Sequence, residues 1–291
     1  MIASSRRGFT LIELLVVLGI IALMAALLVP ALTTVRSQAR SVTCRSNLHQ
    51  IAACWHMYLD ASRGRYPRDP DRAASQPNSV PGAFPVGFFG NITYGGKNGI
   101  KFTRMAAAGE LAGLPRRPLN RYLGIPPTTD SDSATAVFRC PGDRGPITDW
   151  PSVYDGTHYD YFGTSYRTNR FLIGPRPPEP AWEDPCREEI EKVRNSLANL
   201  TRSMVSNESQ LVLMGDYGWE DCWNFTSAVH VEFHGRRPGM DVDASMHNIA
   251  FMDGHVAYVE IRKARHVTAG YTVIPFRSWY NAFITCQNRT Y

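Results

Sequence analysis

The stretch that decides the fold lies close to the amino terminus, where Gly8 to Leu32 reads GFTLIELLVVLGIIALMAALLVPAL. Its apolar part starts at Phe9 and contains about 24 residues. As an α-helix, a segment of that length extends about 36 Å, whereas the hydrocarbon core of a bilayer is about 30 Å thick. We therefore predict that this segment spans a membrane.

One acidic residue, Glu13, interrupts the apolar run near its beginning. An ionised carboxylate buried in hydrocarbon is costly, so such a residue stays near the interface or has a partner. The residues before the run are polar and include Arg6 and Arg7. Positive charge on this side predicts a cytoplasmic amino terminus. A secretory signal has a shorter apolar region of about 7–15 residues, so we expect the run to be retained.

The string Gly8-Phe9-Thr10-Leu11-Ile12-Glu13, joined to an uninterrupted apolar run, resembles the amino terminus of type IV pilins and type II secretion pseudopilins. The resemblance implies that a prepilin peptidase cuts after Gly8 and that the new terminal amine, on Phe9, is methylated. Glu13 matches the family's acidic position, which pairs with the amine of a neighbouring subunit during assembly. Such a pair attracts strongly in a low dielectric. The alternative is a plain signal anchor with Glu13 at the interface.

A proline matches the same family pattern further along the run. Pro30 falls where many pilins bend or locally melt this helix, because proline lacks a backbone donor and clashes with the preceding turn. Beyond it, Thr33 to Leu59 contains no glycine or proline, and apolar residues recur there at helical spacing. We expect one long helix whose second half packs on a globular domain.

The resulting prediction is an α+β fold in four segments. A long amino-terminal helix, membrane-spanning in its first half, packs on a small globular domain with an antiparallel sheet, of pilin type. The expected segments are a cleaved leader at 1–8, a transmembrane and filament-core helix at 9–32, its extension at 33–62, and an extracytoplasmic domain at 63–291.

Local patterns predict several elements within the extracytoplasmic domain. Strands are expected at 137–140, 165–172 and 210–214, and a short helix at 119–123. A further helix is expected after Pro185, with Asp184 as its cap and an apolar face that continues to Met204. The pair Asp253-Gly254 between two apolar runs predicts a hairpin in which both residues have positive φ.

The hairpin region resembles the Asp-Gly-His-Val ending of a processing-associated domain found in many bacterial pilin-like proteins. The signature residues are His247, Asp253, Gly254 and His255. In that domain nine residues separate a histidine from the Asp-Gly pair, and here Asp243 holds the position of that histidine. The resemblance therefore implies an insertion in the preceding loop.

Histidines and carboxylates near the carboxyl terminus form the strongest candidate for a metal site. They are His230, His234, His247, His255, Asp216, Asp241, Asp243 and Asp253. Imidazole and carboxylate groups from neighbouring strands could hold a divalent cation. Some pseudopilins that this chain resembles hold calcium near the carboxyl-terminal strands, so Asp216, Asp241 and Asp243 are the calcium candidates. The alternative is that these residues occupy turns and an exposed strand, and we expect no cofactor apart from possible calcium.

Six cysteines are present, and none forms a Cys-x-x-Cys pair. Disulfides are permitted if the domain lies outside the cytoplasm. Cys44 and Cys54 would lie about 15 Å apart on one helix and cannot bridge. Candidate disulfide residues are Cys54, Cys140, Cys186 and Cys222, for example as Cys54–Cys140 and Cys186–Cys222, among many possible pairings.

Composition and missing motifs exclude other classes of function. A net charge of +5, without a concentrated basic stripe, argues against a nucleic-acid partner. The chain has no Gly-x-Ser-x-Gly elbow, phosphate loop or His-Glu-x-x-His motif, so we expect no enzymatic activity. Most tryptophans should pack in the core, although an exposed cluster such as Trp219 with Trp223 could bind a sugar.

The functional prediction is a structural subunit of a type IV pilus-like or type II secretion pseudopilus filament. The expected partners are other copies or related pilin-like subunits, prepilin peptidase, an inner-membrane assembly platform and membrane lipid. The expected location is the inner membrane, as a single-pass protein with a periplasmic or extracellular domain. The alternatives are a membrane-tethered metal-dependent enzyme and a glycan-binding surface adhesin.

Overall fold

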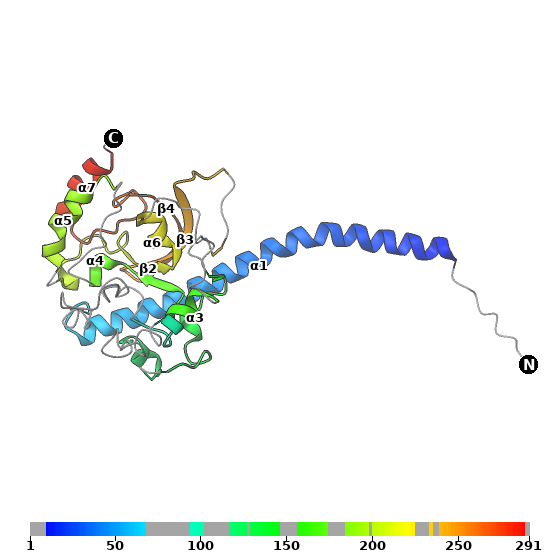
Figure 1. Cartoon of the computed structure of the whole chain (residues 1–291), viewed down its shortest axis with the longest axis horizontal. Helices are drawn as coiled ribbons and strands as arrows, with labels where there is room; N and C mark the ends of the chain where they lie inside the picture. Colours follow the sequence, from blue (N-terminus) through cyan, green and yellow to red (C-terminus); the bar gives the residue numbers. More distant parts are fainter. Residues whose placement is uncertain are drawn as a thin grey trace, which may run out of the picture. The chain divides into compact units, whose positions relative to one another are not determined.

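The computed structural model describes residues 10–67, 94–101, 117–126, 129–145, 156–173, 184–197, 200–224, 233–234 and 239–288. The chain divides into two compact units, with the boundary between Ala39 and Arg40. We describe each unit by itself, and Figure 1 gives the labels of the elements.

The first unit consists of the beginning of helix α1, which runs from Leu11 to Ala61 without a break. The predicted long helix is therefore confirmed, and it is continuous through Pro30. Side chains from Leu11 to Val29 are exposed, although nearly all of them are apolar. Among the described residues, α1 is the helix with the length and composition to cross a membrane.

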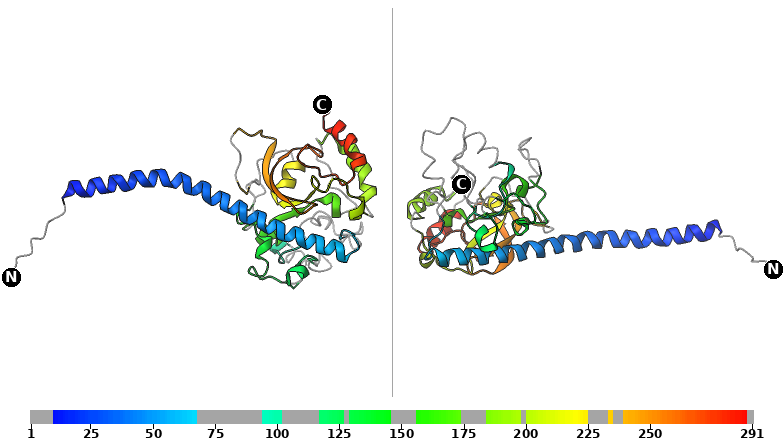
Figure 2. Two further views of the ribbon diagram at one scale, coloured as in Figure 1. Left: turned by 180° about the vertical axis from the view of Figure 1, so that it is seen from behind. Right: turned by 90° about the horizontal axis from the view of Figure 1, so that it is seen from below.

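The second unit begins with the remaining turns of α1, and here the helix is amphipathic. One stripe of its side chains is fully buried: Cys44, Leu48, Ile51, Trp55 and Leu59. These positions recur every three or four residues, which places them on one helical face. The helix ends in a turn at Gly64, whose φ of 75° favours glycine. Figure 2 shows this end of α1 lying along the globular unit.

A four-stranded antiparallel sheet forms the centre of the second unit, in the order β1-β2-β3-β4. The strands are β1 (Tyr166–Thr168), β2 (Val212–Asp216), β3 (Ala244–Phe251) and β4 (Val256–Arg262). All eight residues of β3 are buried, whereas β4 at the edge is mostly half-buried. The predicted α+β class is thus confirmed, and the strand expected at 210–214 lies two residues further along.

Helices cover both faces of this sheet. On one face, Ile51 of α1 lines the same small cavity as Tyr166 and Met214. On the other face lies α6 (Gly218–Asn224), whose Trp219 Nε1 donates to the Arg167 carbonyl at 3.0 Å. Because successive strand residues point to opposite faces, Tyr166 and Arg167 meet different helices. The sheet is therefore enclosed on two sides.

The hairpin β3–β4 has a different turn from the one predicted. Gly254 has a φ of 93°, but Asp253 is not among the residues with positive φ. The Gly254 amide donates to the Phe251 carbonyl at 2.9 Å, and the Phe251 amide donates to the His255 carbonyl at 2.9 Å. These bonds define a three-residue loop with glycine in the left-handed position. The hairpin itself is confirmed.

The remaining elements are short. They are η4 (Asn120–Leu123), η5 (Ala136–Phe138), α3 (His158–Phe162), α4 (Arg170–Ile173), α5 (Arg187–Ser196), η7 (Arg202–Met204), η9 (Arg277–Trp279) and α7 (Tyr280–Gln287). A disulfide between Cys186 and Cys286 joins α7 to the residue that precedes α5.

Four other local predictions were wrong. The strand expected at 137–140 is replaced by η5, and the strand expected at 165–172 stops at Thr168 because α4 follows. The cap of α5 is Cys186, while Asp184 accepts a hydrogen bond from the Cys186 amide at 2.8 Å. Met204, expected on the apolar face of this helix, is exposed.

Candidate functional site

The first candidate site is the start of α1. Thr10 donates to Glu13 Oε2 through its backbone amide at 2.9 Å and its hydroxyl at 2.8 Å. In return, the Glu13 amide donates to Thr10 Oγ1 at 3.3 Å. This reciprocal arrangement is a capping box, the pairing that Thr-x-x-Glu forms at a helix start. The sequence contains this pattern, but the capping role of Glu13 was not predicted.

The surface that follows Glu13 is apolar and unburied within its unit. Leu15 is 62% exposed and Leu27 is 72% exposed. An all-round apolar helix is stable where lipid or other helices surround it. Gly8 and Phe9 lie outside the described residues, so their predicted processing is not located in the structure.

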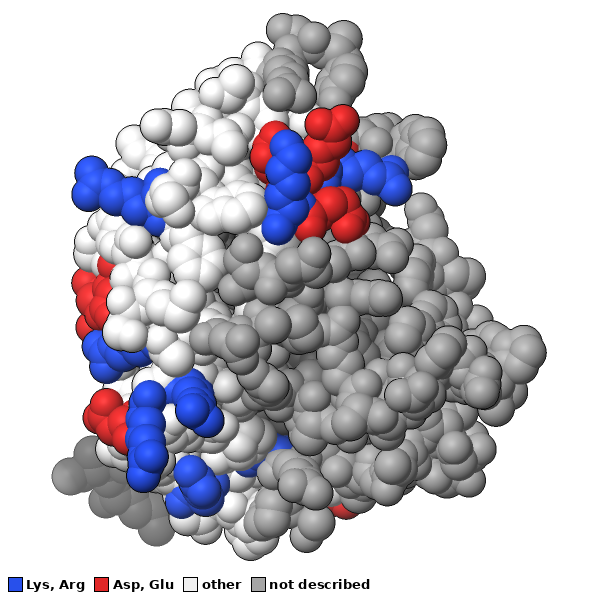
Figure 3. Space-filling model, turned by 90° about the vertical axis from the view of Figure 1, so that its left-hand side faces the viewer, with Lys and Arg blue, Asp and Glu red and all other residues white. Residues whose placement is uncertain are grey.

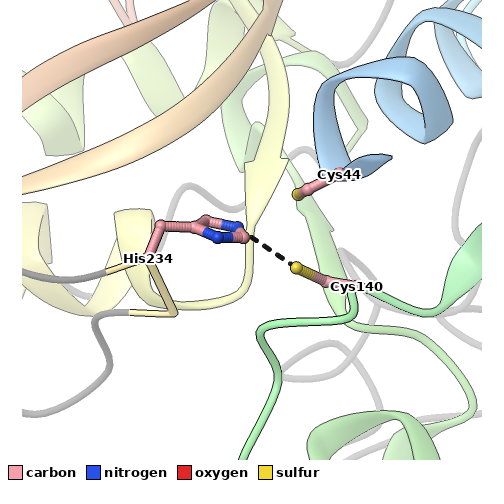
Figure 4. A group of neighbouring side chains, drawn as sticks. All are labelled: Cys44, Cys140 and His234. Atoms are coloured by element: carbon pink, nitrogen blue, oxygen red, sulfur yellow. Dashed lines mark hydrogen bonds between the residues drawn. The ribbon is translucent and has the colours of Figure 1, made fainter. Parts of the chain in front are cut away.

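The second candidate site is a buried group of Cys44, Cys140 and His234 (Figure 4). Cys44 comes from α1, Cys140 follows η5, and His234 lies in the short described segment 233–234. Their potential ligand atoms all lie within 4.8 Å of one another, and His234 Nε2 is 3.2 Å from Cys140 Sγ. Cys44 and Cys140 are at most 1% exposed, and His234 is 9% exposed.

Hydrogen-bond donors surround the two sulfurs. The Gly142 amide donates to Cys140 Sγ at 3.4 Å. Tyr166 contacts Cys44 by a side-chain hydrogen bond, and Asn47 Nδ2 donates to the Tyr166 hydroxyl oxygen at 3.2 Å. Since that oxygen accepts from Asn47, the phenolic proton is available to Cys44. Both sulfurs are therefore placed as hydrogen-bond acceptors.

Burial and these contacts shift the pKa values of the two thiols in opposite directions. Burial raises the pKa of Cys44, but hydrogen bonds with Cys140 and His234 outweigh it and lower the value to about 7. Burial and the neighbouring Cys44 raise the pKa of Cys140 well above its ordinary value. Cys44 is thus the first of the pair to become a thiolate, which is the metal-binding form.

The loop that carries Cys140 is fixed by Asp143. The Asp143 carboxylate accepts from His158 Nδ1 at 3.0 Å, the Tyr159 amide at 3.0 Å and Ser165 Oγ at 2.7 Å. Burial opposes the charge of Asp143, yet these bonds lower its pKa. Gly142 completes the geometry, because a Cβ there would lie 2.8 Å from His234 Cε1. The loop and the histidine can approach closely because residue 142 is glycine.

A second buried network lies between β2 and β3. His247 Nδ1 is 2.5 Å from Asp216 Oδ1, and His247 Nε2 is 2.5 Å from Ser245 Oγ. Burial lowers the pKa of His247, but the Asp216 carboxylate outweighs it and raises the value to about 10. The order of groups is that of a nucleophile, a base and an orienting acid. However, the Ser245 side chain is fully buried, so substrate has no access to it.

The predicted histidine and carboxylate cluster is distributed over separate places in the structure. Asp216 is buried, whereas Asp241 and Asp243 are exposed in a turn before β3. Among the described residues, these three carboxylates do not gather as one group of ligands. Asp253 and His255 pair with each other at 2.6 Å on the hairpin loop. His230 lies outside the described residues.

The two example disulfide pairings were wrong, although the candidate Cys186 is in a disulfide. Cys186 pairs with Cys286, and Cys54, Cys140 and Cys222 are not in disulfides. Cys44 and Cys54 do not bridge each other, as predicted. The expected core packing of the tryptophans is confirmed for Trp219 and Trp223, which are 1% and 2% exposed, so the alternative of an exposed sugar-binding pair was wrong.

A third group, Asp184 with His266 and Cys186, also gathers potential ligands. The Cys186 sulfur is bonded to Cys286 in the disulfide, so it is not a thiolate ligand. Trp223 Nε1 donates to His266 Nδ1 at 3.0 Å, so the other ring nitrogen carries the proton that faces Asp184 at 3.2 Å. This group is accounted for by hydrogen bonds within the protein.

Residues 3–29 match the family model of the prokaryotic N-terminal methylation motif. The chain therefore carries a prepilin segment of the type IV pilin-like kind. No curated protein and no solved structure matches the chain.

Proposed function

We propose that this protein is a structural subunit of a type IV pilus-like or type II secretion pseudopilus filament. The observation that carries the proposal is the apolar, exposed first part of α1, which lies within the methylation motif. Its first turn is capped by hydrogen bonds between Thr10 and Glu13. In the membrane, lipid covers this surface. In a filament, the same surface packs against other copies or related subunits.

Processing by prepilin peptidase after Gly8 would place a new amine on Phe9, one residue before the Thr10 cap. The Glu13 carboxylate already lies at this end of the helix, where the backbone amides of the first turn favour negative charge. A carboxylate has about four acceptor sites, so its bonds with Thr10 leave capacity for an ammonium group. We infer that Glu13 first caps its own helix and then binds the methylated amine of a neighbouring copy.

The single-pass anchor is supported by the one apolar helix and the methylation motif. Arg6 and Arg7 before the helix favour a cytoplasmic amino terminus. The Cys186–Cys286 disulfide favours an oxidising compartment for the second unit. We therefore propose a periplasmic or extracellular domain and an assembly platform in the inner membrane.

We further propose a structural protein in preference to an enzyme, an adhesin or a nucleic-acid binder. Burial of Ser245 disfavours catalysis by its hydrogen-bonded network, and burial of Trp219 disfavours stacking on a glycan. On the face shown in Figure 3, the described basic side chains lie in several separate places, some beside acidic ones. Such a distribution differs from the concentrated basic stripe of nucleic-acid binders.

The test uses three variants that separate capping from subunit pairing. Glu13→Gln keeps an acceptor for Thr10 but removes the charge, Glu13→Ala removes both, and Thr10→Ala removes the partner hydroxyl of the cap. The readout is the amount of subunit recovered in sheared filaments, relative to the amount in the membrane. We expect both Glu13 variants to insert normally and to assemble at about a tenth of the wild-type level or less, and Thr10→Ala to assemble. Normal assembly of Glu13→Gln would contradict the pairing.

A further inference from the structure

The group of Cys44, Cys140 and His234 satisfies the requirements of a metal site. Two sulfurs and one imidazole nitrogen converge from three segments, and the sequence separation of Cys140 and His234 is 94 residues. Soft thiolate ligands with imidazole select zinc among the common divalent cations of proteins. A tetrahedral zinc site requires about 3.8 Å between two sulfurs and about 3.5 Å between sulfur and nitrogen, from bond lengths of about 2.3 and 2.0 Å.

The distances in the structure agree with that geometry to within small side-chain movements. His234 Nε2 is 3.2 Å from Cys140 Sγ, and the three potential ligand atoms lie within 4.8 Å of one another. Each ligand atom points toward the same place (Figure 4).

Polar groups contact the two sulfurs. The Gly142 amide donates to Cys140 Sγ at 3.4 Å, and the Tyr166 hydroxyl oxygen near Cys44 accepts from Asn47 Nδ2 at 3.2 Å. Outer hydrogen bonds of this kind orient metal ligands and tune their basicity. Both sulfurs are almost completely shielded from water, so a bound cation is the group that would neutralise the charge of the cysteine ligands.

The contrast with the disulfide of the same chain favours a metal over oxidation. Cys186 and Cys286 are joined, whereas Cys44 and Cys140 are side by side without a bond and share a histidine. The histidine has no role in a disulfide, but it supplies the third ligand of a zinc site.

We propose that Cys44, Cys140 and His234 are ligands of one Zn²⁺. The ion would link Cys44 of α1 to the loop after η5, through Cys140, and to the segment that carries His234. This structural role is independent of filament assembly and does not rest on the function proposed above.

The experiment uses the full chain, produced in zinc-supplemented cells, extracted in mild detergent and purified without chelator. Inductively coupled plasma mass spectrometry then gives the zinc content per chain. We expect about one zinc ion for the wild type and at least about tenfold less for Cys44→Ser and for His234→Ala. The matched control is Cys54→Ser, which changes a buried cysteine of the same helix outside the group and keeps the zinc.

Two further measurements keep the test decisive if a variant fails to fold. Replacement of zinc by Co²⁺ in the wild type should produce the sulfur-to-cobalt charge-transfer band of a thiolate-ligated ion. Removal of zinc by a chelator should lower the melting temperature of the second unit, and addition of zinc should restore it. A wild-type chain without bound metal, or one in which peptide mapping finds a Cys44–Cys140 disulfide, would overturn the proposal.

Discussion

Leu27 and Leu48 belong to the same helix, yet their surroundings differ completely. Leu27 is 72% exposed within its unit, whereas Leu48 is fully buried in the core of the second unit. The first part of α1 therefore has an apolar surface on all sides, and the second part has one apolar stripe. The helix needs lipid or other subunits to cover its first part, but its second part is stabilised within the chain.

The largest expected effect on stability comes from removing the Cys186–Cys286 disulfide, which lies within the second unit. Replacing both Cys186 and Cys286 by alanine removes a disulfide whose two cysteines are 100 residues apart in the sequence. Chain entropy predicts a loss of about 4–5 kcal/mol in the free energy of unfolding. Chemical denaturation of the full chain in detergent measures it. Reductant should destabilise the wild type but not the double variant, and equal stability of the two proteins would contradict the pairing.

A matched pair of leucines tests the comparison directly. Leu48→Ala should lower the free energy of unfolding of the second unit by about 2–5 kcal/mol, because it leaves a cavity in the core. Leu27→Ala should leave the same quantity within about 0.5 kcal/mol of the wild type. Denaturation followed by near-ultraviolet circular dichroism reports on the second unit. Similar losses for both variants would break the distinction between the two parts of α1.

The third effect is a dependence of stability on pH that belongs to the second unit. Asp216 raises the folded-state pKa of His247 to about 10, above its unfolded value of 6.5. The contribution of the His247–Asp216 pair to the free energy of unfolding is therefore fully present below pH 6.5 and is lost as the pH rises through about 10. The melting temperature of the wild type should therefore fall as the pH is raised from about 6.5 to about 10. His247→Gln should give a flatter curve, while the exposed control His255→Gln should follow the wild type.

The smallest effect concerns the first turn of the first unit. Thr10→Ala removes a hydroxyl that bonds to Glu13 and should destabilise the helix start by about 1 kcal/mol. Hydrogen exchange in detergent should show faster exchange at residues 11–14, with no change in the second unit. Unaltered exchange at these amides would show that the capping box does not form in the detergent-embedded chain.

The sequence was sufficient to predict elements with strong local signals. An uninterrupted pattern of apolar residues predicted α1, and Asp253-Gly254 between apolar runs predicted the hairpin. Local patterns failed where tertiary contacts decide the structure. At residues 136–138 the apolar run forms η5 because Phe138 packs against the glycines of another segment rather than pairing in the sheet.

The candidate site was only partly accessible from the sequence for the same reason. Glu13 could be selected because it lies in a continuous motif. Cys44, Cys140 and His234 come together across long separations and have no characteristic spacing, so neither their grouping nor the Cys186–Cys286 pairing could be derived. His247 and Asp216 were identified as candidates, either for a metal site or for turns and an exposed strand, but their buried pairing was not predicted.

The most direct test of the filament account is the mass of the amino-terminal peptide from protein extracted from a membrane that contains prepilin peptidase. Cleavage after Gly8 predicts a peptide that begins with singly methylated Phe9. The variant Gly8→Ala should remain uncut, while Gly19→Ala, whose added Cβ meets nothing within 4 Å, should be processed normally. A wild-type chain that still begins at Met1 would contradict the account.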